Sequence, residues 1–237
     1  MFHWLERNPF FFAVGVFIVI AFAGLVEVLP DFANKARPVV GAKPYSPLEL
    51  AGRQVYINES CNSCHSQLIR PFKSETDRYG QYSVSGEYAY DRPFLWGSKR
   101  TGPDLHRVGN YRSTDWHENH MWEPSAVVPG SIMPSYKHLF AKNIDAETAF
   151  AEAYTVKHMF GVPYDQTIKD KAGNDIVVEL EGNATDKAAA FENAKRLMLE
   201  QAKAVASQMK NQEVKDAVER GEIRQIVALI AYMNSLK

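Results

Sequence analysis

Cys61-Asn62-Ser63-Cys64-His65 is the stretch of this sequence that decides how the chain folds. Two cysteines separated by two residues and followed at once by a histidine form the attachment pattern of haem c. One helical turn separates the two thiols, so both can form thioether bonds to the two vinyl groups of one porphyrin. His65 is then directed at the iron as an axial ligand. The stretch therefore predicts one covalently bound haem c, held by Cys61, Cys64 and His65.

Two other functions of such a cysteine pair are alternatives. A thioredoxin-like redox pair needs a preceding strand, which residues 46–60 do not predict, and it leaves His65 unexplained. A zinc site needs further ligands at a suitable spacing. With only two cysteines in 237 residues, the chain can form neither a disulfide scaffold nor a four-thiolate zinc site.

The overall composition excludes further classes of protein. The 27 Lys and Arg residues nearly balance the 28 Asp and Glu residues, for a formal net charge of −1, so we expect no nucleic-acid partner. A hydrophobic content of 46% with 12% aromatic residues is too high for a disordered chain. The length allows one large domain or two small ones.

The second axial ligand of the iron has to lie downstream of His65. Met133 is the strongest candidate, because Pro129 and Pro134 stiffen the non-helical loop around it. Three later methionines lie at positions that favour packing in helices, namely Met198, Met209 and Met233. A bis-histidine site is the alternative, and its candidates are His106, His117 and His120. A thioether ligand favours reduced iron and raises the reduction potential.

A ligating imidazole also needs an acceptor for its other N–H group, which fixes the orientation of the ring. Residues 101–105, Thr-Gly-Pro-Asp-Leu, resemble the G-P-x-L stretch of class I cytochromes c, in which the proline carbonyl is that acceptor. The resemblance implies that the Pro103 carbonyl accepts a hydrogen bond from His65, and that Leu105 lies against the porphyrin. A plain turn at Gly102-Pro103 is the alternative.

The N-terminus predicts a membrane anchor within residues 1–30. Residues 10–26 carry no charge, and as a helix they span roughly 26 Å, close to the thickness of a hydrocarbon core. Pro9 suits the first turn, and Pro30 and Asp31 end the run. A cleaved signal peptide is the alternative, with Ala21-Phe22-Ala23 as its cleavage site. Arg7 is the only positive charge before the run, and apolar residues continue past that site, so we expect a retained single span.

Two arguments about topology disagree. Lys35, Arg37 and Lys43 follow the span whereas only Arg7 precedes it, which by the positive-inside rule would place the large domain in the cytoplasm. Haem is joined through thioethers outside the cytoplasm, on the periplasmic side in bacteria. We give the second argument more weight, and expect a cytoplasmic N-terminus and a periplasmic haem domain.

The pattern of the remaining chain predicts a mostly α structure. Residues 31–45, with Pro38 and Pro44, predict an extended tether. A capping box at Ser46 and Glu49 opens a helix that runs into the cysteine pair. The haem domain is expected over 46–237, with an insertion at 141–221. Within and after that insertion the pattern predicts helices at 145–160, 188–210 and 222–236, and a small hairpin in 161–183.

These segments together resemble one family over nearly the whole chain. They are CNSCHSQLIRPF (61–72), SETDRYG (74–80), GEYAYDRPFLWGSKRTGPDL (86–105), DWHENH (115–120), VVPGSIMPSY (127–136) and the anchor ending Glu27–Pro30. They look like the mono-haem cytochrome c subunit, subunit II, of cbb3-type cytochrome c oxidases. Ser60 departs from the family pattern, which usually has glycine there, and Leu68 stands where methionine is common.

The resemblance implies a class I cytochrome c-like domain with a C-terminal insertion, and a function in electron transfer. This subunit would pass electrons from a cytochrome c donor or a di-haem partner subunit to haem b of the catalytic haem–copper subunit, which reduces O2 to water. No oxygen chemistry would occur on this chain. A free-standing, membrane-anchored cytochrome c is the alternative function.

The resemblance also implies a location and further contacts. The protein would lie in the bacterial inner membrane, in contact with lipid. Tyrosines and tryptophans between residues 79 and 122 are candidates for the contact with the catalytic subunit, and core packing around the haem is the alternative. Family members hold a calcium near the haems of that subunit, for which Ser98 is a candidate ligand. Lys99 and Arg100 are candidates to pair with haem propionates, and a solvated face is the alternative.

Overall fold

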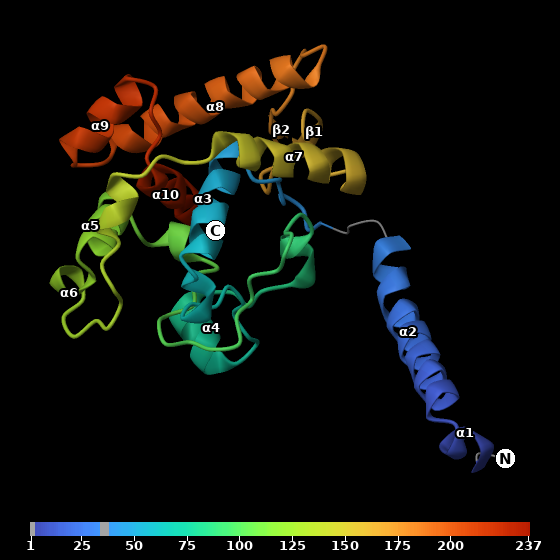
Figure 1. Cartoon of the computed structure of the whole chain (residues 1–237). Helices are drawn as coiled ribbons and strands as arrows, with labels where there is room; N and C mark the ends of the chain where they lie inside the picture. The colour runs from blue at the N-terminus through green and yellow to red at the C-terminus, as the bar shows by residue number, and fades with distance from the viewer. Residues whose placement is uncertain (1–2, 34–37) are drawn as a thin grey trace. The chain divides into compact units, whose positions relative to one another are not determined.

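The computed structural model describes residues 3–33 and 38–237, and the chain divides into two units between residues 37 and 38 (Figure 1). The first unit holds α1 (His3–Arg7) and α2 (Pro9–Ala33). The second holds, in order, α3 (Pro47–Asn58), η1 (Cys61–Ser63), α4 (Lys73–Tyr79), η2 (Ser85–Tyr88), η3 (Val108–Asn110), α5 (Thr114–Trp122), α6 (Pro124–Val127), η4 (Lys137–Phe140), α7 (Ala146–Phe160), β1 (Thr167–Lys169), β2 (Asp175–Val177), α8 (Lys187–Ser207), α9 (Gln212–Glu219) and α10 (Gln225–Ser235). The protein is mostly α, as the sequence predicts.

Helix α2 is long and apolar enough to cross a membrane. Its stretch Pro9–Leu29 has a mean hydropathy of 2.6, and Pro9 begins the helix as expected. The helix continues past Pro30 to Ala33, so Pro30 and Asp31 end the apolar run but not the helix. Less than one turn follows Pro30, which confines the missing backbone hydrogen bond to the end of the helix.

The expected tether at 31–45 is shorter than its sequence suggests. Residues 31–33 belong to α2, residues 34–37 lie outside the described residues, and residues 38–45 pack on the second unit. The Val39 amide donates to the Gly86 carbonyl at 3.1 Å, and the Tyr164 hydroxyl donates to the Tyr45 carbonyl at 2.7 Å. Prolines and a lack of periodicity thus indicate an irregular segment here, but this segment is hydrogen-bonded to the rest of the unit and is not a free tether.

Helix α3 is the centre of the second unit. Ser46 accepts from the Glu49 amide while the Glu49 carboxylate accepts from the Ser46 amide, so the predicted capping box is formed. Nearly all of the helix is buried, and its main partner is α10. The two helices cross so closely at Gly52 that a Cβ there would lie 1.9 Å from the Ala228 carbonyl oxygen.

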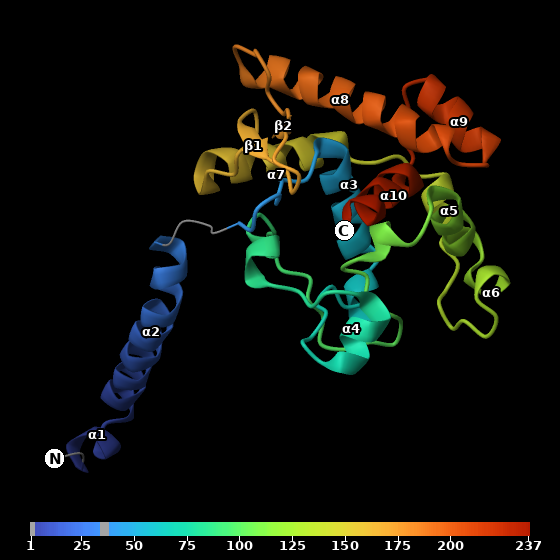
Figure 2. The same cartoon turned by 180° about the vertical axis from the view of Figure 1, so that it is seen from behind.

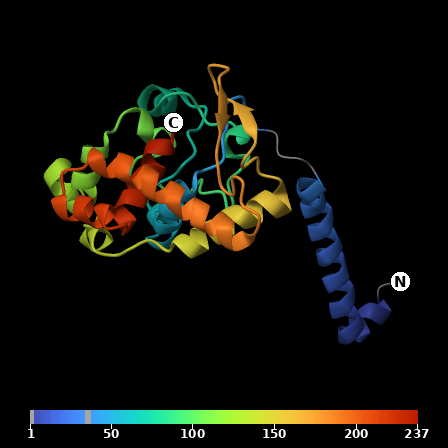
Figure 3. The ribbon, with the colours of Figure 1, turned by 90° about the horizontal axis from the view of Figure 1, so that it is seen from above.

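The region predicted as an insertion forms a second apolar cluster that shares residues and helices with the first. Helix α7 and the β1–β2 hairpin confirm the expected helix and hairpin, and the strands pair antiparallel with Ile168 opposite Ile176. Phe150, Tyr164, Leu180 and Ala194 pack together in this cluster. Figure 3 shows the hairpin from above. Helix α8 also reaches the main core through Met198. The insertion is therefore packed into the same unit and is not a separate layer.

The helical stretch predicted at 188–210 is divided in two. Helix α8 ends at Ser207, and α9 begins after Asn211, whose side chain caps it by accepting from the Val214 amide. Between them, the Glu118 carboxylate of α5 accepts from the amides of Lys210 and Asn211 at 2.6 and 2.7 Å. A carboxylate from a distant helix thus satisfies amides that a continuous helix would have used itself.

Residues 61–140 contain short helices joined by irregular segments. Figures 1 and 2 show α8 along one side of the second unit and α4 at the opposite side, with α3 between them. The sequence pattern predicts this lack of long periodic elements, but it does not predict the nine-residue helix α5. The irregular segments hold the predicted site.

Candidate haem c site

The cysteine motif forms a tight turn directly after α3. The helix ends at Asn58, Ser60 adopts a left-handed backbone with φ of 55°, and η1 begins at Cys61. The Cys64 and His65 amides both donate to the Cys61 carbonyl, at 3.2 and 2.9 Å. The left-handed backbone explains why the resembled pattern favours glycine at position 60, since glycine adopts it without strain.

Both thiols are free, and their environment is unlike that of a redox pair. Burial, with the nearby Glu59 carboxylate, raises the pKa of the Cys61 thiol to about 12. Reactive redox cysteines have lowered pKa values instead. Within the described residues, no group of three or more His, Cys, Asp or Glu side chains is placed to bind a metal ion, so a zinc site at this pair gains no further ligand.

The imidazole of His65 is held by the backbone of a distant loop. Its Nδ1 lies 2.8 Å from the Pro103 carbonyl oxygen, which can only accept, so Nδ1 carries the proton and Nε2 is left as the free lone pair. That is the tautomer of a metal-ligating imidazole. The hydrogen bond expected from the G-P-x-L resemblance is therefore present.

Gly102 lets the two segments come this close. A Cβ at this position would lie 2.3 Å from Cε1 of His65, which leaves no room for any other residue. The Gly102 amide donates to the Cys64 carbonyl at 2.9 Å, and the Leu105 amide donates to the Ser66 carbonyl at 2.8 Å. These main-chain bonds pair the segment after the cysteines with the 102–105 loop, and Gly102-Pro103 is more than a plain turn.

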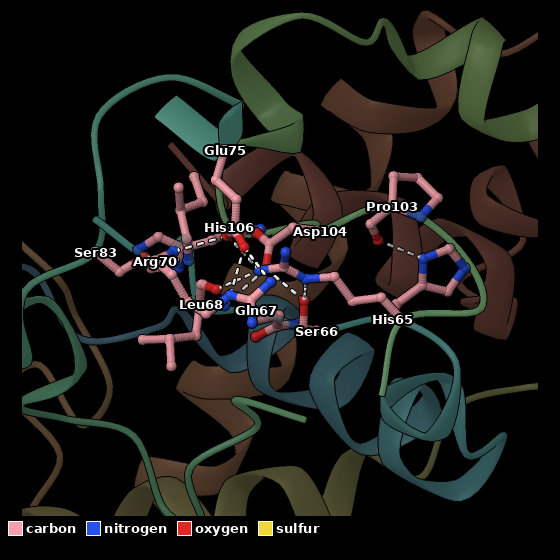
Figure 4. A network of polar contacts seen from close by, with 12 residues as sticks. His65, Ser66, Gln67, Leu68, Arg70, Glu75, Ser83, Pro103, Asp104 and His106 are labelled. Carbon is pink, nitrogen blue, oxygen red and sulfur yellow. Dashed lines mark hydrogen bonds and ion pairs between the residues drawn. The ribbon is translucent and has the colours of Figure 1, made fainter. Parts of the chain in front are cut away.

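Asp104, directly after Pro103, belongs to a buried polar network that no motif in the sequence predicts (Figure 4). Asp104 accepts hydrogen bonds from the Ser66 hydroxyl and the Leu68 amide. Arg100 bridges Asp104 and Glu75, at 3.3 and 2.8 Å. The pairing of Arg100 with a haem propionate stays a prediction.

Met133 lies half-buried against the main core, as does Leu105. Its loop is non-helical, as expected, and its amide donates to the Ser131 hydroxyl at 3.2 Å. The three methionines assigned to packing are fully buried in the core, namely Met198, Met209 and Met233. Met133 is thus set apart from them by partial burial and by its loop.

The three candidate histidines differ in their surroundings. His106 is held by the Glu87 carboxylate at 3.3 Å and packs on the Tyr88 ring. His117 is 2% exposed, and both its ring nitrogens lack a hydrogen-bond partner within the described part of the chain. Burial lowers the pKa of His117 to about 4, so it is neutral at pH 7. His120 stacks on Trp116 at 4.5 Å and has an unpartnered Nδ1.

These residues fit a haem c. Two thiols lie on one turn, and the histidine beside them has the tautomer that leaves Nε2 free. On α5, within the described residues, the buried His117 has no partner for either ring nitrogen and the half-buried His120 has none for Nδ1. Buried polar groups without partners are rare in a finished protein and point to a group that completes them.

A comparison with protein families decides the class. The family model described as "Cytochrome C oxidase, mono-heme subunit/FixO" matches residues 2–237. The chain belongs to this family. No curated protein matches it. As a FixO-family protein it is a mono-haem subunit of a cbb3-type oxidase, part of an oxidoreductase complex in a membrane, and the apolar helix α2 fits its anchor.

For Ser98 as a calcium ligand, the structure provides the position of the residue and no further support. It is exposed, like Lys99, in the loop that leads to Arg100. Calcium at Ser98 stays a prediction. No motif in the sequence identified the buried Asp104 and Glu75, because the residues that contact them come from irregular segments with no periodic pattern. The one sequence signal for this network was a charged residue, Asp104, inside the G-P-x-L stretch.

Proposed function

We propose that this chain carries electrons through one haem c to the catalytic subunit of its oxidase. Cys61 and Cys64 would hold the haem covalently, and His65 Nε2 and the Met133 sulfur would bind its iron. The observation that carries the proposal is the 2.8 Å hydrogen bond from His65 Nδ1 to the Pro103 carbonyl. When bound, the haem supplies a one-electron iron couple.

The residues of the chain orient and tune that couple. The Pro103 carbonyl fixes the plane of the His65 ring and increases the electron density on its free nitrogen. A thioether from Met133 favours reduced iron and raises the reduction potential, which suits a chain that feeds an oxidant. Leu105 lies against the porphyrin and keeps water from it.

The electron route is inferred from the family. Electrons arrive from a cytochrome c donor or from the di-haem subunit and leave to haem b of the haem–copper subunit, where O2 is reduced. The proposal assigns the oxygen chemistry to that subunit and not to this chain. Exposed aromatic side chains between residues 79 and 122 are candidates for the contact with the catalytic subunit, namely Tyr82, Phe94, Trp96, Tyr111 and Trp122. A calcium near that contact, with Ser98 as a ligand, belongs to the same proposal.

Location follows from the chemistry of attachment. Thioether bonds to haem are made outside the cytoplasm, so the haem domain is periplasmic and the N-terminus cytoplasmic, with α2 in the bacterial inner membrane. Tagging each end with an enzyme that is active only on one side of the membrane tests this. Activity of the periplasmic reporter at the N-terminus would contradict it.

Covalent attachment is tested by replacing both thiols. The pair Cys61→Ala and Cys64→Ala should abolish the haem that remains on the chain after denaturing electrophoresis. Ser63→Ala is the matched control, because it changes the same turn and leaves both thiols. A haem stain that survives the double substitution would refute the assignment.

The sixth ligand is tested by Met133→His, which should lower the reduction potential, since a second imidazole favours oxidised iron. Met159→His is the control, because Met159 is 73% exposed. An unchanged potential in Met133→His would move the assignment to His117 or His120.

A free-standing electron carrier is the second candidate function, because the motif, Met133 and a small core suffice for it. Purification in mild detergent separates the two. The oxidase function predicts that the haem–copper subunit copurifies with this chain, and isolation of the chain alone would favour the carrier.

A further inference from the structure

Asp104 is the most completely buried charged group beside the proposed site. Its side chain has no exposed surface, and its two carboxylate oxygens contact residues of two segments. Oδ2 accepts from the Ser66 hydroxyl at 2.6 Å and from the Leu68 amide at 2.8 Å, whereas Oδ1 accepts from the His106 amide at 2.9 Å. Asp104 therefore joins the segment that follows His65 to the loop that carries Pro103.

Arg100 closes this arrangement from the other side. Its guanidinium donates to the Ser66 hydroxyl and, at 2.6 Å, to the Leu68 carbonyl, so it binds the same two residues as Asp104. It also pairs with Asp104 itself at 3.3 Å and with Glu75 at 2.8 Å. Glu75 in turn accepts from the Arg70 amide at 2.9 Å and pairs with the Arg70 guanidinium. Two carboxylates and two guanidinium groups thus fix residues 66–70 against residues 100–106.

The two partners of the proposed hydrogen bond are direct neighbours of this network in the chain. Ser66 follows His65, and Asp104 follows Pro103. A hydrogen bond between a ring nitrogen and a main-chain carbonyl has no side chain of its own to hold its acceptor in place. The distance between His65 and Pro103 therefore depends on how firmly Ser66 and Asp104 are joined.

We propose that Asp104 is a positioning residue that holds the Pro103 carbonyl against His65 and thereby sets the reduction potential of the haem site. The inference rests on the proposed function, because it takes His65 as an iron ligand. Asp104 does not touch the iron or the porphyrin; it acts through Ser66, Pro103 and the His65 ring.

Two physical effects act in the same direction. A firmly held acceptor makes the His65 ring a stronger donor to iron and so favours the oxidised state. A buried negative charge near the iron also favours the oxidised state, and little water screens it. Loss of the Asp104 charge should therefore raise the potential.

A purely structural role for Asp104 makes a different prediction. In that case the carboxylate would only stabilise two irregular segments. Its loss would lower the melting temperature and the yield of haem-loaded protein, and the potential of the protein that does fold would stay unchanged.

The test compares three variants of the full-length, haem-loaded protein in detergent. Asp104→Asn keeps the shape and removes the charge. Ser66→Ala removes two hydrogen bonds of the network, one to Asp104 and one from Arg100, without changing charge. Asp165→Asn is the control, because Asp165 is another carboxylate that accepts three backbone amides, from residues 180–182, and pairs with Lys157 in the hairpin region. Its left-handed backbone, with φ of 59°, suits asparagine.

Potentials are measured by spectroelectrochemical titration. We expect Asp104→Asn to shift the equilibrium with a redox buffer toward the reduced state by about tenfold, the size of one buried charge at moderate distance. Ser66→Ala should shift it in the same direction by less, and Asp165→Asn should leave it at the wild-type value. A wild-type potential in Asp104→Asn overturns the proposal, whatever happens to stability.

Three further outcomes are also decisive. If Asp104→Asn fails to accumulate, Ser66→Ala decides alone, and a wild-type potential in that variant overturns the proposal. If the wild-type protein carries haem while Asp104→Asn shows no shift, only the positioning role fails. If the wild type carries no haem on Cys61 and Cys64, the proposed function fails together with the inference.

Discussion

The two halves of the second unit are held together by different forces. Within the described residues 38–237, all twelve buried polar or charged residues lie between Glu49 and Glu118, and residues 119–237 contribute none. Apart from α3, the first half has short helices and hydrogen-bonded loops, whereas the second has α7, α8 and α10, which pack through apolar side chains and, together with α3, form the scaffold.

This difference separates a site from its scaffold. Apolar packing tolerates changes of shape if volume is kept, whereas a buried polar group without its partner costs about 1–3 kcal/mol. The buried polar groups of the site half therefore fix the positions of the site residues, and the apolar packing of the scaffold half supplies most of the free energy of folding. Substitutions in the scaffold should change stability and leave the site intact, and substitutions in the site should do the reverse.

The largest expected effect is in the scaffold, at the crossing of α3 and α10. Gly52→Ala would place a Cβ 1.9 Å from the Ala228 carbonyl oxygen, and neither backbone can move without separating the helices. We expect a loss of at least ~4 kcal/mol and an unfolded second unit. Limited proteolysis measures this. Gly24→Ala in α2, with nothing within 4 Å, is the control, and a protease-resistant Gly52→Ala protein would show that the crossing adapts.

Met198→Ala should have the next largest effect on stability. Met198 is fully buried where α8 meets the main core, and its truncation should cost about 2–5 kcal/mol. The folded fraction should keep its full haem content and its wild-type potential, because the main packing partners of α8 are the helices α3, α7, α9 and α10 and not the irregular segments that carry His65 and Pro103. Thermal unfolding and potentiometry measure both, with Met159→Ala as an exposed control; a shifted potential would break the division between site and scaffold.

Gly102→Ala should instead disturb the site and leave the scaffold folded. A Cβ 2.3 Å from the His65 ring must displace the imidazole or the loop, at a cost of about 1–3 kcal/mol. We expect the helices to stay folded by circular dichroism while the haem content falls and the remaining haem loses its wild-type spectrum. Lys99→Ala, an exposed neighbour in the same loop, should change neither. A wild-type spectrum in Gly102→Ala would mean that the His65 contact is not needed.

Glu75→Gln should have the smallest effect, and that effect depends on pH. The hydrogen bond from Arg100 is the main cause that lowers the pKa of Glu75 to about 2, from an ordinary value of 4.5. The ionised Glu75 therefore stabilises the fold above pH 4.5, and this contribution is lost as the pH falls toward 2. At pH 7 the substitution should cost about 1.5 kcal/mol.

Melting temperatures between pH 7 and pH 2 measure this. The difference between the wild type and Glu75→Gln should be constant down to about pH 4.5 and then shrink. Asp77→Asn, which removes an exposed pair with Lys73, should give only a small difference at any pH. A constant difference down to pH 2 would show that Glu75 acts through its shape and not through its charge.

The scaffold was the easier half to predict from the sequence. Helical periodicity and caps identified α3, α7, α8 and α10 to within a few residues, because apolar packing leaves a repeating pattern. The break before α9 was missed, because its cause is Glu118, ninety residues earlier in the chain. Local patterns cannot show such a partner.

In the site half, prediction succeeded where one short motif contains the chemistry. The cysteine spacing and Gly102-Pro103 identified His65 and its acceptor, and the structure forms that hydrogen bond. The network around Asp104 joins residues more than thirty positions apart in segments without periodicity, so no pattern predicts it. Residues 38–45 were misjudged for the same reason, since their partners lie far along the chain.

The crossing of α3 and α10 has a consequence for the order of synthesis. Helix α3 leads directly into the cysteine turn, but its main partner is the last helix of the chain. At ribosomal rates, α10 is completed roughly 10–30 s after the two thiols have been made. During that interval the segment that carries the thiols lacks the helix against which α3 packs most, and a chain interrupted before α10 never acquires it.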